Sequence, residues 1–205
     1  MHQYLQIEPH VFNCKVCPTP CDGVSKMNYV FENDAAFSEH YEQQLIAHIN
    51  QFTPFKAQKT TQKGYPDIEV VNSLGQHFYI EVKVQRRTFM TVEKILPESG
   101  LKPSETVALN LSDLTRYFEL EQEKQIHIFI FWVLLNRPCI LGEDESRYYY
   151  RLASELKPIW EREQQKRKFR RKSGQGDEVE GKHLGVTVNY HFSLKELKVW
   201  DGKLS

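Results

Sequence analysis

The pattern of apolar and polar positions divides the middle of the chain into short elements. Apolar residues between Tyr41 and Phe52 recur at helical spacing, which predicts a helix over Ala35–Phe52. Polar and turn-forming residues then separate three stretches with the short apolar alternation typical of strands. These predicted strands are Phe55–Thr61, Tyr65–Val71 and Phe78–Val84.

The next part of the chain predicts a loop, a helix and a buried strand. Residues 97–104 contain two prolines and a glycine, which favours a loop. A helix is expected over Ser112–Lys124, followed by the apolar stretch His127–Leu135, which is typical of a strand buried on both faces. The order helix, strand, strand, strand, helix, strand predicts an α/β fold with a mixed sheet covered by helices.

The chain divides into three predicted regions. Residues 1–34 are irregular and rich in cysteine, 35–135 form the α/β core, and 136–205 form a C-terminal α/β extension. Within that extension we expect a strand over Arg147–Leu152, a basic helix over Ala153–Lys172 and a strand over Gly185–Phe192.

Composition narrows the classes of function. The chain has 205 residues, of which 40% are hydrophobic and 26% charged, and its 27 basic and 27 acidic residues give a net charge of zero. This excludes a globally basic binder but allows a local basic patch. The longest apolar run, Ile126–Leu135, is too short to cross a bilayer. With no secretory signal at the start, we expect a cytoplasmic protein with reduced cysteines and no membrane partner.

Polar residues interrupt the apolar pattern of two neighbouring predicted strands. Glu81 and Lys83 share the second face of Phe78–Val84, whose first face is apolar, and Asp67 lies in the preceding strand. Two carboxylates on adjacent strands can hold Mg²⁺ with water and a phosphate oxygen. A lysine beside them can orient the attacking water and offset charge on the phosphate. The pattern therefore predicts a site for phosphodiester hydrolysis.

The first predicted helix supplies a third acidic group. Glu42 falls inside the apolar arc of this helix, whereas Glu39 falls near its edge. A carboxylate on a buried face is costly unless it meets a partner or a metal. We therefore expect Glu42 to join Asp67 and Glu81, with Glu39 as the alternative.

This arrangement resembles the PD-(D/E)xK nuclease superfamily, which has the restriction-endonuclease-like fold. The resemblance rests on Pro66-Asp67, a gap of thirteen residues, Glu81-Val82-Lys83 and the preceding helix YEQQLIAHI. The pattern is most similar to that of archaeal Holliday-junction resolvases, and it covers residues 35–135. It implies an αβββαβ core with a mixed central sheet.

The resemblance also implies a divalent-metal-dependent DNA endonuclease. In that reading Asp67, Glu81 and Glu42 bind Mg²⁺ or Mn²⁺, and Lys83 is the catalytic lysine. Cutting both strands of DNA favours a homodimer. One alternative is a catalytically inactive module of the same fold that binds nucleic acid or assembles through a zinc-stabilised segment. Another is a zinc-stabilised protein–protein adaptor unrelated to nucleases.

A cysteine cluster near the N-terminus predicts a structural metal. Three thiols lie within eight positions, and thiolates two residues apart readily bind tetrahedral Zn²⁺. One alternative is that these are reduced thiols without a metal, and another is that they hold an iron–sulfur cluster. The expected ligands are Cys14, Cys17, Cys21 and either His10 or Cys139.

Six cations fall between positions 166 and 172. Clustered cations attract the phosphate backbone by counterion release, without reading sequence. The alternative is a solvated helix end whose cations favour the helix dipole. We expect the segment to be loosely ordered until DNA binds. The predicted nucleic-acid-binding residues are Lys166, Lys168, Arg170, Arg171, Arg86 and Arg87.

Overall fold

A six-stranded mixed sheet forms the centre of the molecule. The computed structural model describes residues 31–135, 137, 139–141, 145–170, 178–179, 182–183 and 188–203. The strands are β1 (Lys56–Lys59), β2 (Ile68–Val71), β3 (His77–Gln85), β5 (His127–Leu134), β6 (Arg147–Leu152) and β11 (Lys198–Val199). Their order across the sheet is β1-β2-β3-β5-β6-β11. Strands β3 and β5 are parallel, and the other neighbouring pairs are antiparallel.

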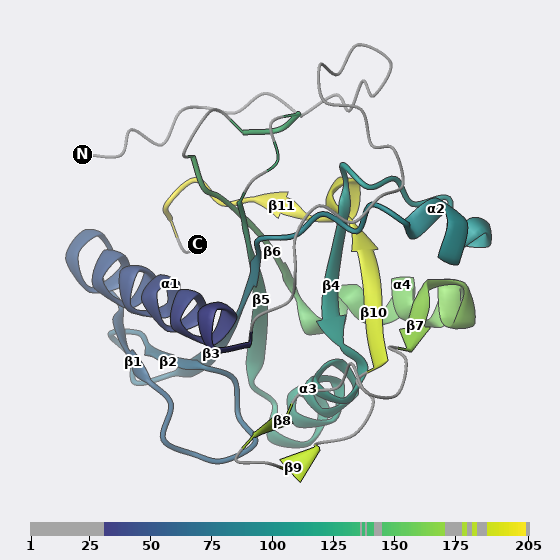
Figure 1. The fold of residues 1–205 in the computed structure, drawn as a ribbon. Helices are drawn as coiled ribbons and strands as arrows, with labels where there is room; N and C mark the ends of the chain where they lie inside the picture. Colours follow the sequence, from purple (N-terminus) through teal and green to yellow (C-terminus); the bar gives the residue numbers. More distant parts are fainter. Residues whose placement is uncertain are drawn as a thin grey trace.

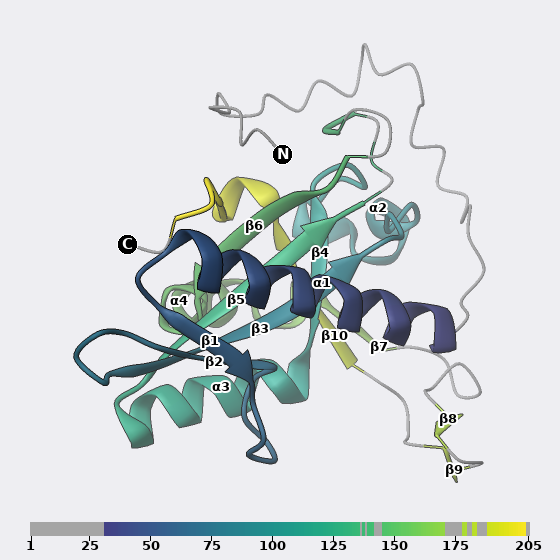
Figure 2. The same cartoon turned by 90° about the vertical axis from the view of Figure 1, so that its left-hand side faces the viewer.

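Helices cover both faces of this sheet. Helix α1 (Phe31–Phe52) lies across one face, where it packs on β1 and β3. Helices α3 (Leu111–Lys124) and α4 (Ala153–Glu163) contact each other and β5 on the opposite face. Figures 1 and 2 show α1 separated from α3 and α4 by the sheet. The molecule therefore has three layers.

The two-residue alternation of β3 divides its side chains between the two faces, as predicted. Ile80 and Val82 are buried in the core beneath α1, together with Leu45 and Ile49. Tyr79 faces the other core, which α3 and α4 cover. The polar residues that alternate with Ile80 and Val82 consequently lie on the α3 side of the sheet.

A tight turn sets the register between β2 and β3. The Asn72 side-chain oxygen accepts hydrogen bonds from the backbone N–H groups of Leu74 and Gln76, both at 2.9 Å. Gly75 has φ +75°, a conformation that costs glycine little. The predicted turn is confirmed, and it pairs Ile68 of β2 with Ile80 of β3.

A second sheet joins the core to the C-terminal extension. Its strands are β4 (Thr106–Asn110), β10 (Val188–Ser193) and β7 (Lys168–Arg170), in that order, all antiparallel. Strand β4 was not expected. Its buried Val107 and Leu109 pack with Tyr190 and Phe192 of β10 against Trp132 of the large sheet. The shorter elements are α2 (Val92–Ile95), η1 (Pro97–Ser99), η2 (Gln164–Arg167), η3 (Leu194–Glu196), β8 (Glu178–Val179) and β9 (Lys182–His183).

The predicted helix over Ala153–Lys172 is wrong in its second half. Helix α4 ends at Glu163, and Gln164 takes a positive φ of 41°, which breaks the helical path. Arg167 then turns inward, where its guanidinium is 2.6 Å from Glu196 Oε2. The residues that follow pair with β10 as strand β7. An internal ion pair and strand pairing thus replace the expected basic helix.

The fold class predicted from the sequence is confirmed. Helix α1, three strands, α3 and β5 follow one another in the expected αβββαβ order around a mixed sheet, with β4 inserted before α3. The first helix begins at Phe31, earlier than predicted. Within the described part of the chain, no helix combines the length and apolar character that a membrane crossing requires.

Candidate active site

Adjacent strands bring the two predicted strand carboxylates together. Asp67 immediately precedes β2, and its Oδ2 accepts a hydrogen bond of 2.9 Å from the backbone N–H of Val82 in β3. Glu81, one residue before Val82, is 3% exposed. The register of β2 and β3 puts Asp67 and Glu81 on the same face of the sheet, toward α3. The period-two argument from the sequence therefore located this pair correctly.

Both carboxylate oxygens of Glu81 have partners. The Lys83 ammonium forms an ion pair with Oε1. The Tyr117 hydroxyl, which comes from α3, donates a hydrogen bond to Oε2. Tyr117 is itself 1% exposed, so this contact lies in the interior. The Glu81 carboxylate is thus held from the strand side and from the helix side.

A fourth acidic residue, Asp113, was not expected at the site. Its Oδ2 lies 3.7 Å from Lys83 Nζ, and its Oδ1 lies 2.7 Å from Arg116 Nη2. Asp113 is in the first turn of α3, where an acidic residue is favoured simply by the helix dipole. Because an acidic residue is common at that position, the sequence did not mark Asp113 as a site residue. Its spacing of four residues from Tyr117, which places both on one helical face, could have indicated that it belongs to the site.

Burial shapes the protonation of the cluster. It raises the pKa of Asp67 above its ordinary value, and the negative charges of Glu42 and Asp113 add to the rise. Burial likewise raises the pKa of Glu81, which the Lys83 charge opposes. Burial alone would lower the pKa of Lys83, but the surrounding carboxylates outweigh it and the pKa is raised. The carboxylates of the cluster therefore hold Lys83 in its charged form.

Glu42 and Glu39 occupy different environments on α1. Glu42 is 7% exposed, whereas the Glu39 side chain is 66% exposed. The charge of Glu42 contributes to the raised pKa of Asp67. Lys59, which ends β1, does not distinguish the two residues, because its Nζ lies 3.4 Å from Glu42 Oε2 and 3.3 Å from Glu39 Oε1. The burial of Glu42 and its effect on Asp67 favour Glu42 over Glu39 as the third acidic group.

Exchanging one carboxylate at a time on α1 should separate these roles. We expect Glu42→Gln to weaken Mn²⁺ binding about tenfold, because it removes a buried charge that acts on Asp67. Glu39→Gln should leave the affinity nearly unchanged, since that side chain is exposed and screened. Calorimetric titration with Mn²⁺ measures both. The reverse ranking would transfer the role to Glu39.

The donor set suits a hydrated divalent cation rather than a closed metal cage. Among the described residues, no three His, Cys, Asp or Glu side chains converge as a ready-made metal cluster. Mg²⁺, however, commonly binds through one or two carboxylates and keeps several waters. Glu81 is a buried carboxylate and Asp67 a half-buried one, both with raised pKa values, and a cation would stabilise their charged forms. These residues therefore fit the metal that the sequence predicts.

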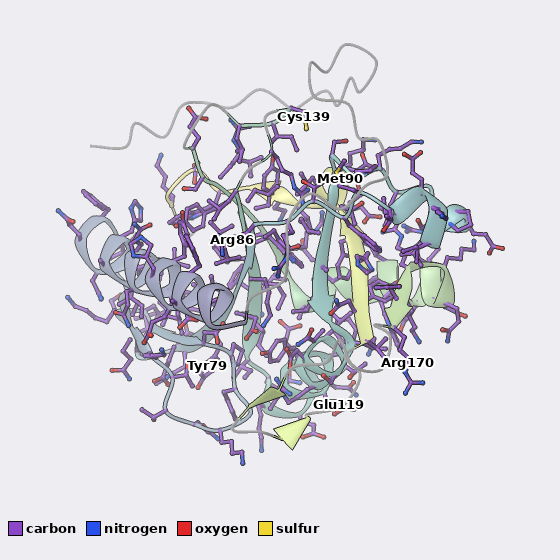
Figure 3. All side chains as sticks on the ribbon, viewed as in Figure 1. Tyr79, Arg86, Met90, Glu119, Cys139 and Arg170 are labelled. Carbon is purple, nitrogen blue, oxygen red and sulfur yellow. The ribbon has the colours of Figure 1, made fainter. Side chains whose placement is uncertain are left out.

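The predicted cysteine site falls largely outside the described residues. The undescribed part includes four of the expected ligands, so the zinc or iron–sulfur site stays a prediction; these are Cys14, Cys17, Cys21 and His10. Cys139 is partly exposed in the segment after β5. Figure 3 shows it at the opposite end of the molecule from Glu119 and Arg170.

The predicted nucleic-acid-binding residues lie in two parts of the chain, after β3 and after α4. Arg86 and Arg87 directly follow β3, and the Arg86 guanidinium lies 3.8 Å from the centre of the Phe37 ring. Lys166 is in η2, and Lys168 and Arg170 are in β7. Figure 3 shows Arg86 and Arg170 in separate parts of the molecule. Arg171 lies outside the described residues, and a role in DNA binding stays a prediction for the whole set.

Comparisons with known proteins give a distant structural likeness. No protein-family model matches the chain, and no curated protein matches it. A solved structure that resembles it is that of Hjc from Archaeoglobus fulgidus, a Holliday junction resolvase from an archaeal hyperthermophile. The identity is 12% and the TM-score 0.38, over 57% of this chain and 78% of that chain.

Proposed function

We propose that this protein is a divalent-metal-dependent DNA endonuclease that hydrolyses phosphodiester bonds. The observation that carries the proposal is the meeting of Asp67, Glu81 and Lys83 on one face of two adjacent strands. Buried carboxylates beside a charged lysine are costly as a purely structural device. They are the groups that hydrolysis of a phosphodiester needs.

Each residue of the cluster has a distinct role in this proposal. Asp67 and Glu81 would hold Mg²⁺ or Mn²⁺, with Glu42 supplying further negative charge. The bound metal would act as a Lewis acid on the phosphate and lower the pKa of its water. Because its pKa is raised, Lys83 stays charged near neutral pH. In its charged form Lys83 would act as a hydrogen-bond donor to the water or phosphate.

The remaining regions would serve binding and assembly. The cations after α4 and after β3 would contact the DNA backbone, which supplies affinity without sequence preference. The part of residues 1–34 that precedes α1 would form a zinc-stabilised segment, followed in the chain by the core 35–135 and the extension 136–205. Cleavage of both strands would be simplest in a homodimer.

A second candidate is a catalytically inactive module of the same fold that binds DNA or assembles through residues 1–34. One observation favours it: both oxygens of Glu81 already have partners, Lys83 and Tyr117. A metal at Glu81 must therefore displace or share the Lys83 contact. The two candidates differ in whether DNA is cut.

Cleavage assays distinguish these candidates. We expect the protein to cut plasmid, branched or single-stranded DNA with Mg²⁺ or Mn²⁺, and to stop when EDTA removes the metal. Asp67→Asn should abolish cutting. Glu69→Gln is the matched control, since Glu69 lies on the same face of β2 but contacts Gln58 and His77. DNA binding without cutting under any divalent ion would favour the inactive module.

A further inference from the structure

Lys83 lies between two carboxylates from different elements. It forms an ion pair with Glu81 of its own strand and lies 3.7 Å from Asp113 Oδ2 on α3. Its side chain is 27% exposed, whereas that of Glu81 is 4% exposed. The Lys83 ammonium thus lies near two acceptors and contacts that of Glu81 more closely than that of Asp113.

Asp113 is held so that one oxygen stays directed at Lys83. Arg116, one turn later on α3, lies 2.7 Å from Oδ1 of Asp113. The other oxygen, Oδ2, is the one nearest to Lys83. A shift of about 1 Å would bring Lys83 Nζ from its present distance to ordinary ion-pair hydrogen-bonding distance. The flexible four-carbon lysine side chain can make such a shift without backbone movement.

A cation bound at Glu81 would repel the Lys83 ammonium, and Asp113 offers the ammonium another acceptor. Tyr117 occupies Oε2 of Glu81, and Lys83 occupies Oε1. A divalent cation at Oε1 would place two positive groups side by side, and their repulsion is strong in a partly buried site. Lys83 must then leave Glu81, and a charge left without a partner there would be costly.

We propose that Asp113 is a positioning residue that accepts Lys83 when Glu81 binds a divalent cation. Asp113 thereby lowers the cost of loading the metal and keeps the ammonium beside the reacting phosphate. This inference rests on the metal site proposed above at Asp67 and Glu81. It assigns to α3 a function that the strand motif alone does not contain.

A simpler effect could mimic this role. Any negative charge near the site raises cation affinity through its field, whatever Lys83 does. The two explanations differ in one respect: the field of Asp113 acts whether or not a lysine is present, whereas the positioning role disappears with Lys83. A double-mutant cycle separates them.

The test is calorimetric titration of the full chain with Mn²⁺ in four proteins: the parent, Asp113→Asn, Lys83→Met, and the double variant. Asparagine keeps an Oδ1 acceptor for Arg116, so the fold of α3 should be preserved. We expect Asp113→Asn to weaken Mn²⁺ binding about tenfold in the parent and less than about twofold in the Lys83→Met background. Asp113→Glu should restore much of the parent affinity.

The outcomes separate this inference from the proposal beneath it. Absence of Mn²⁺ binding to the parent would overturn the metal site itself, and with it the role of Asp113. Binding to the parent with an equal loss in both backgrounds would reduce Asp113 to a field effect. An unchanged affinity in Asp113→Asn would likewise overturn its role while leaving the metal site in place. Thermal unfolding of each variant checks that the protein titrated is folded.

Discussion

Replacing Lys83 with methionine should lower the rate of DNA cleavage about 10³-fold. Lys83 forms an ion pair with the buried Glu81, and the proposed mechanism uses its charge at the phosphate. Single-turnover cleavage with saturating Mn²⁺ measures the loss. Lys102→Met is the matched control, because Lys102 pairs with Glu93 at the surface, where an ion pair contributes little. A Lys83→Met protein that cuts like its parent would remove the lysine from the mechanism.

The same variant should have a characteristic pH dependence of stability. Glu81 already has a pKa raised above its ordinary value of 4.5. Losing Lys83 should raise it further. A carboxyl whose folded-state pKa is raised destabilises the native state as the pH rises from its unfolded value toward its folded value. The stability gap between parent and variant should therefore widen as the pH rises above the folded-state pKa of Glu81 in the parent, which itself lies above 4.5. Urea denaturation between pH 4 and pH 8 measures the gap.

Arg167→Met should lower the free energy of unfolding by about 3 kcal/mol. Arg167 is 6% exposed and is paired with Glu196 at 2.6 Å, with Glu163 at 3.8 Å. Removing the guanidinium takes away the buried partner of both carboxylates, which keep only the exposed Arg162 as a described cationic neighbour, while methionine preserves much of the packing. Urea denaturation at neutral pH gives the change.

The matched control for this substitution is Arg170→Met, three residues later. Arg170 is exposed in β7, so its replacement should change stability little. In DNA binding the ranking should reverse, with Arg170 the more important residue. Equal stability of the two variants would mean that Arg167 belongs to the basic surface and not to the interior.

The sequence predicted those helices and strands whose buried residues follow the regular spacing of apolar positions along the chain. The alternation of β3 predicts that Glu81 and Lys83 share one face, and the helical arc of α1 selects Glu42. Strand β4 was not predicted because it has only five residues, three of them apolar, and so short a stretch shows no clear periodicity. Its identity as a strand depends on pairing with β10, a distant part of the chain.

The basic segment shows a different limit of sequence reasoning. A run of cations in a sequence predicts side chains that are all exposed to solvent. Arg167 is nevertheless buried, because it forms ion pairs with Glu163 and Glu196. Only one of these acids is near in sequence. Tyr117 and Asp113 were missed for a similar reason: on α3 they look like a core aromatic and a first-turn acid. Their contacts with Glu81 and Lys83 depend on how α3 packs over β3.

The pairing of β4 with β10 has a consequence for synthesis on the ribosome. Helix α3, which carries Asp113 and Tyr117, follows β4 directly and packs against α4 and β10. The ribosome adds about 5–20 residues per second, so several seconds separate the emergence of Asn110 from that of its partner Asn189. During that interval Val107 and Leu109 lack their β10 neighbours and are candidates for chaperone binding. The packing of α3, which carries Asp113 and Tyr117, is therefore completed only after β10 has been synthesised.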